Sequence, residues 1–359
     1  MSWREKLRIC SFRTQKTILF VFILFAAFGV NNNGGDLMWF PTVLFVEGKD
    51  VYMHYILNHT DWFMTSVPNY PPLFYEILFP FSFFSFTAFK FIWYIIVVSI
   101  LLFSVYSFIN TLKSKQEAWI FTCLILVNVF LISSLRVGQI TPLIFSAGLL
   151  MIISKSRLLY LLPWSLKFTF GLPLFLILVN RIKQWKLLFL IGLIHLVSLL
   201  VYSFHADVNL LSALGFLKVA EFSKFTLGTA SGKYDLMSLL INNNFLNIFF
   251  YYKIVILFFV FGIGFLIKSK QISKQICIAI LISLIFFFHL SYDYSLLMLV
   301  VLVRLPKINW IFIYHLIIFI IFIIFEILVK FQIIIPEKLN VILTTLLILS
   351  LIIELRNEK

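Results

Sequence analysis

The sequence predicts an all-α, polytopic helical membrane protein, and three observations lead to that prediction. Hydrophobic residues make up 62% of the 359 residues, charged residues make up 12%, and the mean hydropathy is +1.05. A soluble chain of this length could not bury so much apolar surface. Apolar runs of roughly 15–20 residues recur along the whole chain, as bilayer-spanning helices require. The runs do not alternate apolar and polar residues, so the strands of a membrane β-barrel are not expected.

The formal net charge of +14 comes from Lys and Arg residues that cluster at the ends of the apolar runs. This placement is typical of residues that orient membrane helices and face anionic lipids, so we do not expect a nucleic-acid partner. The positive-inside rule puts these clusters in the cytoplasm: the leader up to Lys16, Lys113–Lys115, Lys155–Arg157, Arg181–Lys186, Lys268–Lys274, Arg304–Lys307 and Arg356–Lys359.

The apolar runs between these clusters are the predicted spans. The first is expected to be retained, because no small-residue cleavage site follows it. Residues 158–180, around Lys167, are predicted to form two half-helices that dip into the membrane. Counting that element as two gives about 12 spans, with both termini cytoplasmic. The other spans are 17–30, 90–111, 118–133, 140–154, 185–203, 252–267, 274–290, 294–304, 309–328 and 339–355.

This topology places the longer loops on the outer face, at 31–71, 204–234 and 329–338, with shorter turns at 134–139 and 289–293. Residues 72–88 and 235–250 are apolar but fit the topology only as interfacial or re-entrant helices. We therefore predict a single integral-membrane domain over residues 1–359, with no separate soluble domain.

Cysteine and histidine spacing gives no sign of a metal or redox site. The three cysteines, Cys10, Cys123 and Cys277, lie far apart. Five histidines show no ligand spacing and are interpreted as interface or loop residues: His54, His59, His195, His205 and His315.

Unusual polar residues gather in the segments predicted on the outer face. Asp36 follows two glycines just beyond the first span, where an ionisable residue near the membrane is a candidate functional group. The other candidates are Asp50, Tyr52 and Tyr70 in the first loop, Arg136 and Gln139 after the third span, Lys167 in the broken element, and His289, Tyr292 and Asp293 late in the chain.

An acid, cations and aromatic residues on one face suit the transfer of a sugar from a lipid phosphate to a hydroxyl. The acceptor hydroxyl needs a carboxylate base to take its proton. The leaving phosphate gains charge and needs Arg or Lys nearby. The anomeric carbon becomes oxocarbenium-like, as in glycoside hydrolysis. A long prenyl tail requires an apolar, aromatic groove open to lipid.

Structural explanations stay open for the first-loop candidates. Asp36 also fits a polar residue that ends a helix after two glycines. Asp50 also fits a turn or helix N-cap. Tyr70 also fits the stiff start of a helix, since two prolines follow it.

The later candidates have structural explanations too. Arg136 also fits an anchor that reaches lipid headgroups, and Lys167 fits a side chain that snorkels to the interface. His289 and Asp293 also fit a pair that caps helix ends.

Taken in order, these segments resemble the integral-membrane glycosyltransferases with the GT-C fold. Within them, the chain is most similar to the polyprenyl-phosphate-mannose-dependent family, glycosyltransferase family 87. Val51 stands where that family has Pro. The matching segments fall roughly within residues 15–305: Gly35-Asp36, Gly48–Tyr52, Tyr70–Leu73, Pro80, Arg136–Gln139, Lys167, Pro173-Leu174 and His289–Tyr294.

The resemblance implies an inverting transfer of a hexose, with mannose favoured, from a polyprenyl-phosphate donor to a lipid, glycan or protein acceptor. It implies that Asp36 is the general base and that Arg136 and Lys167 bind the donor phosphate. The sugar or acceptor pocket would take Asp50, Tyr52, Tyr70, Gln139, His289, Tyr292 and Asp293. No second acid stands beside Asp36, so a divalent metal is not indicated and metal dependence stays open. The expected location is the plasma membrane, with the active site on the outer face.

Other classes remain open. A lipid-linked-sugar flippase or transporter also needs intramembrane charges and broken helices, but no paired repeats are visible. An O-antigen ligase or polymerase typically has Arg and His in a large central outer loop, whereas residues 204–234 hold His205 and no Arg. A membrane subunit without chemistry is a third alternative.

Overall fold

The computed structural model describes residues 3–29, 34–35, 37–58, 67–154, 161–179, 185–219, 255–256, 258–260, 262–263, 271–286, 291–305, 308–331, 333 and 336–356. Every regular element among these residues is a helix and none is a strand, which confirms the predicted all-α class. The predicted interfacial segment 235–250 lies outside the described residues, as do Asp36 and His289.

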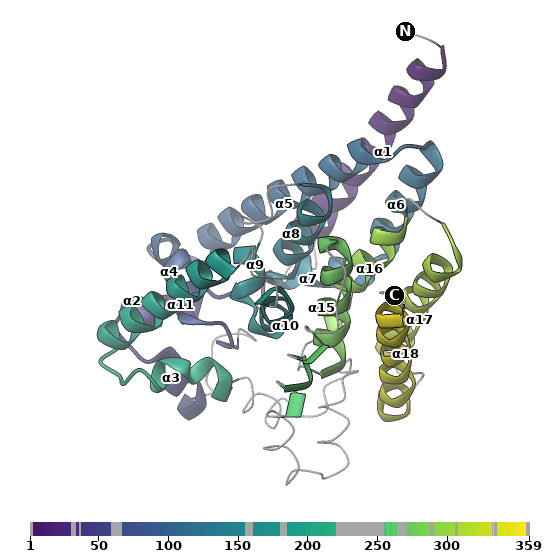
Figure 1. Ribbon diagram of the computed structural model, residues 1–359. Coiled ribbons are helices and arrows are strands. Elements are labelled where there is room, and N and C mark those ends of the chain that lie inside the picture. The colour runs from purple at the N-terminus through teal and green to yellow at the C-terminus, as the bar shows by residue number, and fades with distance from the viewer. Residues whose placement is uncertain are drawn as a thin grey trace.

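Four helices from the first half of the chain form one packed group. Helix α1 packs along α5 and α6, and α5 packs along α8 (Figure 1). Lys16 Nζ donates to Asn110 Oδ1 at 2.7 Å, and Tyr106 Oη donates to the Lys16 carbonyl at 3.0 Å, so two polar contacts fix α1 against α5. These four helices span Trp3–Phe28 (α1), Phe86–Thr111 (α5), Lys115–Val127 (α6) and Thr141–Ile153 (α8).

Within the part of the chain that the structure describes, two helices are candidate membrane spans. Phe86–Thr111 and Trp310–Val329 are long and apolar enough to cross a bilayer by length and composition. Other predicted spans coincide with shorter apolar helices at Thr141–Ile153, Phe189–His205 and Ser273–Phe286. These helices are compatible with a membrane protein, while the count of about 12 spans stays a prediction.

The predicted span 118–133 is two helices and not one. Helix α6 ends at Asn128, α7 (Val129–Val137) begins there, and the pair is bent by 52°. Asn128 Oδ1 accepts from the backbone N–H of Leu131 at 3.0 Å, so this side chain caps α7 and favours the break. Helix α7 continues to Val137, and the predicted turn at 134–139 therefore begins later than expected.

The predicted break around Lys167 is confirmed, while the prediction that this element dips into the membrane stays a prediction. Helix α9 (Leu161–Leu166) stops one residue before Lys167, and α10 (Phe168–Val179) starts one residue after it. At Gly171, a Cβ atom would lie 2.4 Å from the Trp164 carbonyl oxygen, so only glycine lets the two pieces approach so closely. Helix α10 packs on α11 (Trp185–His205) and on α15 (Ile272–Phe286).

The predicted first outer loop at 31–71 contains helices α2 and α3, and the apolar segment predicted as interfacial at 72–88 contains α4 and η2. They group with α11 at one end of the molecule (Figure 1), where α4 packs on α11 and α2 packs on α4. Asp50 starts α3 as an N-cap, because its carboxylate accepts from two backbone N–H groups of the first turn. The elements are α2 (Trp39–Val46), α3 (Val51–Asn58), α4 (Pro72–Leu78) and η2 (Phe79–Phe81), with η4 (Ser212–Leu214) following α11.

The C-terminal helices are held together by a buried charge pair. Arg304 Nη2 lies 2.5 Å from Glu354 Oε2, and His315 Nδ1 lies 3.7 Å from Glu354 Oε1. The predicted span 294–304 falls on the end of η6 and on α16, which has eight residues and a length of about 12 Å, and its crossing of the membrane stays a prediction. The elements are η6 (Ser291–Leu296), α16 (Leu297–Arg304), α17 (Trp310–Lys330) and α18 (Pro336–Arg356).

Candidate functional site

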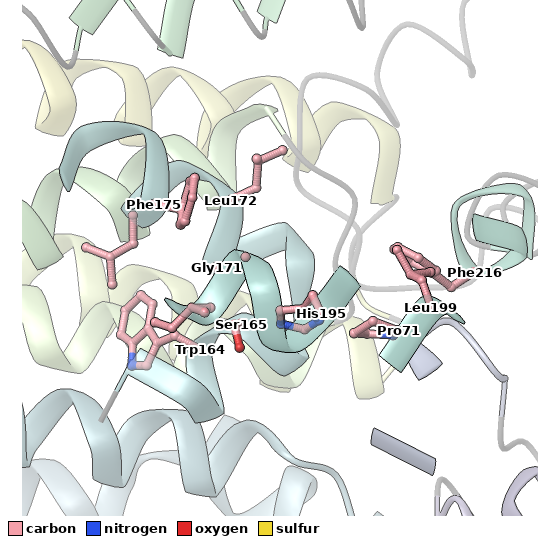
Figure 2. Close-up of a pocket in the computed structure, with 12 residues that line it drawn as sticks. Pro71, Trp164, Ser165, Gly171, Leu172, Phe175, His195, Leu199 and Phe216 are labelled. Atoms are coloured by element: carbon pink, nitrogen blue, oxygen red, sulfur yellow. The ribbon is translucent and has the colours of Figure 1, made fainter. Parts of the chain in front are cut away.

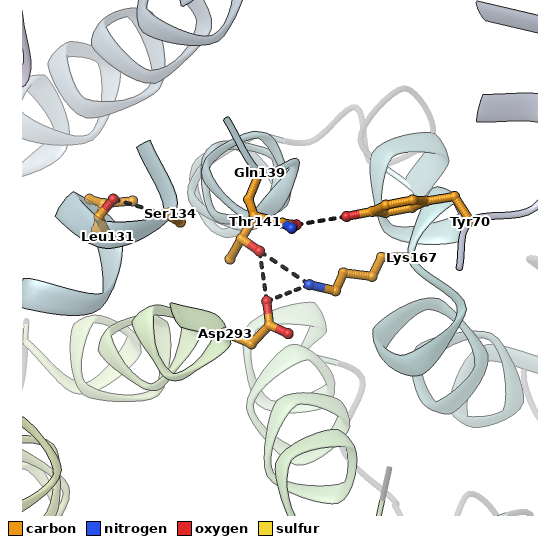
Figure 3. Close-up of polar contacts among 7 residues, drawn as sticks. All are labelled: Tyr70, Leu131, Ser134, Gln139, Thr141, Lys167 and Asp293. Atoms are coloured by element: carbon orange, nitrogen blue, oxygen red, sulfur yellow. Dashed lines mark hydrogen bonds and ion pairs between the residues drawn. The ribbon is translucent and has the colours of Figure 1, made fainter. Parts of the chain in front are cut away.

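A buried ion pair joins two of the predicted site residues that are far apart in the sequence. Lys167 Nζ lies 2.5 Å from Asp293 Oδ1 (Figure 3). The exposed fraction is 11% for the Lys167 side chain and 1% for that of Asp293. The break between α9 and α10 presents the lysine, and the short helix η6 presents the aspartate. A pair removed from water in this way persists only when both charges are present, because either one alone is costly to bury.

Thr141 completes the cluster, although it was not among the site residues predicted from the sequence. Its Oγ1 donates to Asp293 Oδ1 at 2.6 Å and accepts from Lys167 Nζ at 3.3 Å. Thr141 is the first residue of α8, so this helix directs its N-terminal end toward the carboxylate. Pro142 could have indicated this position of Thr141 from the sequence. Proline favours the first turn of a helix, so it places Thr141 at the N-terminal end of α8, close to Gln139.

Tyr70 and Gln139 form a second polar contact beside this cluster. Tyr70 Oη donates to Gln139 Oε1 at 2.7 Å, and both side chains are buried. Figure 3 shows this pair next to Thr141, Lys167 and Asp293. The structure thus brings together four predicted site residues, which come from the start of α4, the α7–α8 turn, the helix break and η6.

The turn before Gln139 depends on glycine. Gly138 ends α7 with φ +81°, a left-handed conformation that other residues adopt only with strain. A Cβ atom there would also lie 2.7 Å from Leu37 Cγ. The close packing fixes the backbone from which Gln139 extends.

Arg136 contributes its backbone to this region. Its carbonyl oxygen accepts from Tyr94 Oη at 3.0 Å and from the Gly34 N–H at 3.3 Å. These bonds attach the end of α7 to the segment that precedes position 36. Among the residues described, none is hydrogen-bonded or ion-paired with the Arg136 guanidinium, and its phosphate-binding role stays a prediction.

Asp50 and Tyr52 belong to a series of hydrogen bonds that ends at the backbone of Tyr70. Tyr202 Oη donates to Asp50 Oδ1 at 3.0 Å, and the backbone N–H of Tyr52 donates to the same oxygen at 3.1 Å. Tyr52 Oη in turn donates to the Tyr70 carbonyl at 2.9 Å. Burial raises the pKa of Tyr52 well above its ordinary value, and the neighbouring Tyr75 adds to the rise. Tyr52 therefore stays a neutral hydrogen-bond donor. The contacts match the N-cap alternative for Asp50, and its substrate contact stays a prediction.

Three predicted site residues are not placed by the structure. Asp36 and His289 lie outside the described residues. Tyr292 belongs to η6, but the structure does not describe its side chain. Within the described parts of the chain, no three His, Cys, Asp or Glu side chains are grouped as metal ligands would be.

An apolar pocket with a volume of 260 Å³ lies among α9, α10, α11 and the start of α4 (Figure 2). Pro71 and Ser165 line it, and they are close in sequence to Tyr70 and Lys167 of the polar cluster. His195 also lines it from within α11, so it does not lie in a loop, and its position at a membrane interface stays a prediction. The remaining lining residues are Trp164, Gly171, Leu172, Leu174, Phe175, Ile191, Gly192, Leu199 and Phe216.

The hydroxyl of Tyr70 provides a direct test of the polar contacts. We expect Tyr70→Phe to lower the free energy of unfolding by about 1–3 kcal/mol, because buried Gln139 would lose its donor. Denaturant unfolding of the purified protein in lipid–detergent micelles measures this free energy of unfolding. Tyr106→Phe is the matched control, because it removes a hydroxyl bonded to the Lys16 carbonyl on a less buried side chain. Equal losses for the two variants would contradict a special role for the Tyr70–Gln139 contact.

No family model, no curated protein and no solved structure matches this chain.

Proposed function

We propose that this protein is a membrane glycosyltransferase that moves a hexose from a polyprenyl-phosphate donor to the hydroxyl of a lipid, glycan or protein acceptor. The observation that carries the proposal is the buried cluster of Lys167, Asp293 and Thr141 beside the Tyr70–Gln139 contact. It joins a cation, an acid and neutral hydrogen-bonding groups from four separate segments. Such sites serve the recognition of a phosphate and a sugar.

The proposed reaction is an inverting substitution at the anomeric carbon. The acceptor oxygen forms a bond to that carbon while the bond from the carbon to the phosphate oxygen breaks. The phosphate leaves with the electron pair, and the carboxylate of Asp36 takes the acceptor proton. Arg136 and Lys167 stabilise the charge that develops on the leaving phosphate.

Lys167 is suited to the phosphate role by the way it is held. An ammonium group has three N–H donors, and Asp293 and Thr141 fix its direction. A phosphate oxygen would compete with Asp293 for this ammonium, so donor binding would weaken the ion pair. Tyr70, Gln139, Tyr292 and His289 are assigned to the sugar or acceptor, and mannose is the sugar that the family resemblance favours.

The finer description of the fold belongs to the same proposal. It comprises a GT-C fold with about 12 spans, both termini in the cytoplasm and the site on the outer face of the plasma membrane. Support comes from the lipid-suited surface, because α5 and α17 expose large apolar side chains such as Phe91, Phe103 and Ile313.

The proposal is tested with the full-length protein reconstituted in liposomes, with radiolabelled polyprenyl-phosphate mannose and a mixed lipid-acceptor extract. We expect labelled sugar to appear on the acceptor, and Lys167→Ala to weaken donor use. Lys49→Ala is the matched control, because Lys49 pairs with Glu47 in an exposed contact. Movement of the donor across the bilayer without transfer would favour a flippase, and transfer of whole oligosaccharides would favour a ligase. Unchanged donor affinity in Lys167→Ala would refute the phosphate assignment.

A further inference from the structure

The side chain of Tyr52 is enclosed by the protein. It is 1% exposed, although the family resemblance assigns Tyr52 to the substrate pocket. Three aromatic rings lie against its own ring, with centroids 5.2 Å away for Tyr202, 6.1 Å for Tyr75 and 6.2 Å for Phe216. The backbone N–H of Tyr52 donates to Asp50 Oδ1 at 3.1 Å. A sugar or an acceptor has no access to this side chain in the structure, so its role depends on the groups that it holds.

The hydroxyl of Tyr52 holds the backbone of Tyr70. Tyr52 Oη donates to the Tyr70 carbonyl at 2.9 Å, and the hydroxyl of the same Tyr70 donates to Gln139 Oε1 at 2.7 Å. The carbonyl belongs to the planar peptide unit that joins Tyr70 to Pro71, whose φ is −63°. A bond that fixes this plane also fixes the direction in which the Tyr70 side chain leaves the backbone. Figure 3 shows that this direction leads to Gln139, beside Lys167.

The position of Tyr52 depends in turn on the segment that follows α11. A Cβ atom at Gly215 would lie 2.6 Å from Tyr52 Cβ and 2.7 Å from Tyr52 Cδ2. Because Tyr52 Cβ is attached directly to the backbone of α3, it cannot move aside as the end of a flexible side chain can. Helix α11 fixes the start of α3 as well, since the Val51 N–H donates to Tyr202 Oη at 2.9 Å. Contacts with α11 and with Gly215 therefore set the place of the residue that holds Tyr70.

We propose that Tyr52 is a positioning residue, which sets the hydroxyl of Tyr70 on Gln139 by holding the Tyr70 carbonyl, and that Gly215 seats Tyr52 for this task. The inference rests on the proposed function, because that function assigns Tyr70 to the sugar or the acceptor. It goes further by connecting the segment after α11 to the geometry of the site. Tyr52 itself does not touch the substrate.

A spectroscopic test of this proposal needs no substrate. The full-length protein in nanodiscs carries a fluorinated tyrosine at position 70, and the fluorine chemical shift reports the hydrogen bond of the adjacent hydroxyl. Gln139→Leu removes the acceptor and calibrates the shift. We expect Tyr52→Phe and Gly215→Ala to move the signal in the same direction as Gln139→Leu. Tyr106→Phe is the matched control, because it also removes a hydroxyl that donates to a backbone carbonyl, and its signal should stay at the wild-type position. A wild-type signal in either Tyr52→Phe or Gly215→Ala would overturn the proposal.

A kinetic test separates positioning from a general structural role. Transfer in liposomes is measured for the wild type, Tyr70→Phe, Tyr52→Phe and the double variant. We expect each single substitution to lower kcat/KM about fivefold, the factor that one neutral hydrogen bond contributes. If Tyr52 acts through Tyr70, the double variant should lower kcat/KM no further, whereas independent effects that multiply to about 25-fold would overturn the proposal. Absence of transfer by the wild type would refute the sugar-transfer function, and the fluorine shift would still decide whether Tyr52 positions Tyr70.

Discussion

Replacing Asp293 with Asn is expected to lower the free energy of unfolding by about 3–5 kcal/mol and to abolish sugar transfer. The carboxylate is 1% exposed and lies 2.5 Å from the ammonium of Lys167, so its loss removes a negative charge that neutralises a buried cation. The contact of Lys167 to Thr141 cannot supply that charge.

A double substitution distinguishes stability from catalysis. Lys167→Met in the Asp293→Asn background also removes the cation of the ion pair, so we expect most of the lost stability to return. We expect transfer to stay absent, because the group that binds the phosphate is also gone. Denaturant unfolding and the liposome transfer assay, applied to the wild type, Asp293→Asn and the double variant, give both quantities.

The exposed ion pair between Lys49 and Glu47 is the control for this experiment. The two atoms lie 2.7 Å apart, but the exposed fractions of the side chains are 53% and 47%. We expect Glu47→Gln to cost about 1 kcal/mol or less, since solvent screens such pairs. A similar small cost for Asp293→Asn would mean that its carboxylate does not neutralise a buried charge.

The second large effect is expected at Asp36. Asp36→Asn should reduce transfer by about 10²–10⁴-fold, because an amide keeps the shape of the side chain but cannot accept the acceptor proton. Membrane insertion should be unchanged. Asp36→Glu should retain part of the activity, since it keeps a carboxylate in the same loop. The rate is measured with saturating donor, so that a defect in donor binding does not mimic a defect in proton transfer.

Asp50→Asn is the natural comparison, because Asp50 is the other acid that competes for the role of base in the first outer loop. Its carboxylate caps α3 and accepts from Tyr202, so the variant should lose about 1 kcal/mol of stability and keep most of its transfer rate. Near wild-type transfer by Asp36→Asn, or a greater loss in Asp50→Asn, would assign the base to Asp50 instead.

Local signals in the sequence predicted the helices well. Apolar runs marked α5, α8, α11 and α17 to within a few residues, and Pro72 marked the start of α4. Capping residues explain several of these boundaries. Ser114 caps α6 by accepting from the Glu117 N–H at 3.1 Å, and Asn309 caps α17 in the same way. Such contacts join residues three apart, so they can be recognised from the sequence alone.

The bend at Asn128 was missed because an apolar run was given more weight than one polar residue. The run continues on both sides of Asn128, and this pattern predicts a single span. An Asn side chain, however, can start a new helix inside such a run by accepting from the N–H three residues later.

Contacts across the molecule could be predicted only in part. The resemblance grouped Lys167 and Asp293 in one site, but their pairing across 126 positions depends on how α9, α10 and η6 pack. Thr141 lies 152 positions from Asp293, and no local pattern connects them. His195 was set aside because its spacing to other histidines suggested no metal site. Its place in a pocket wall depends on five segments that meet there, namely Pro71, α9, α10, α11 and Phe216. Spacing between histidines along the chain does not reveal such a pocket.

The pairing of Arg304 with Glu354 has a consequence for how the chain matures. Ribosomes deliver α16 well before α18, so Arg304 enters the assembling bundle before its acidic partner has been synthesised. The native charge balance of this region is therefore reached only when the last helix arrives. Until α18 is in place, Arg304 lies among apolar helices without the carboxylate of Glu354, and that desolvation cost is offset only in the assembled bundle.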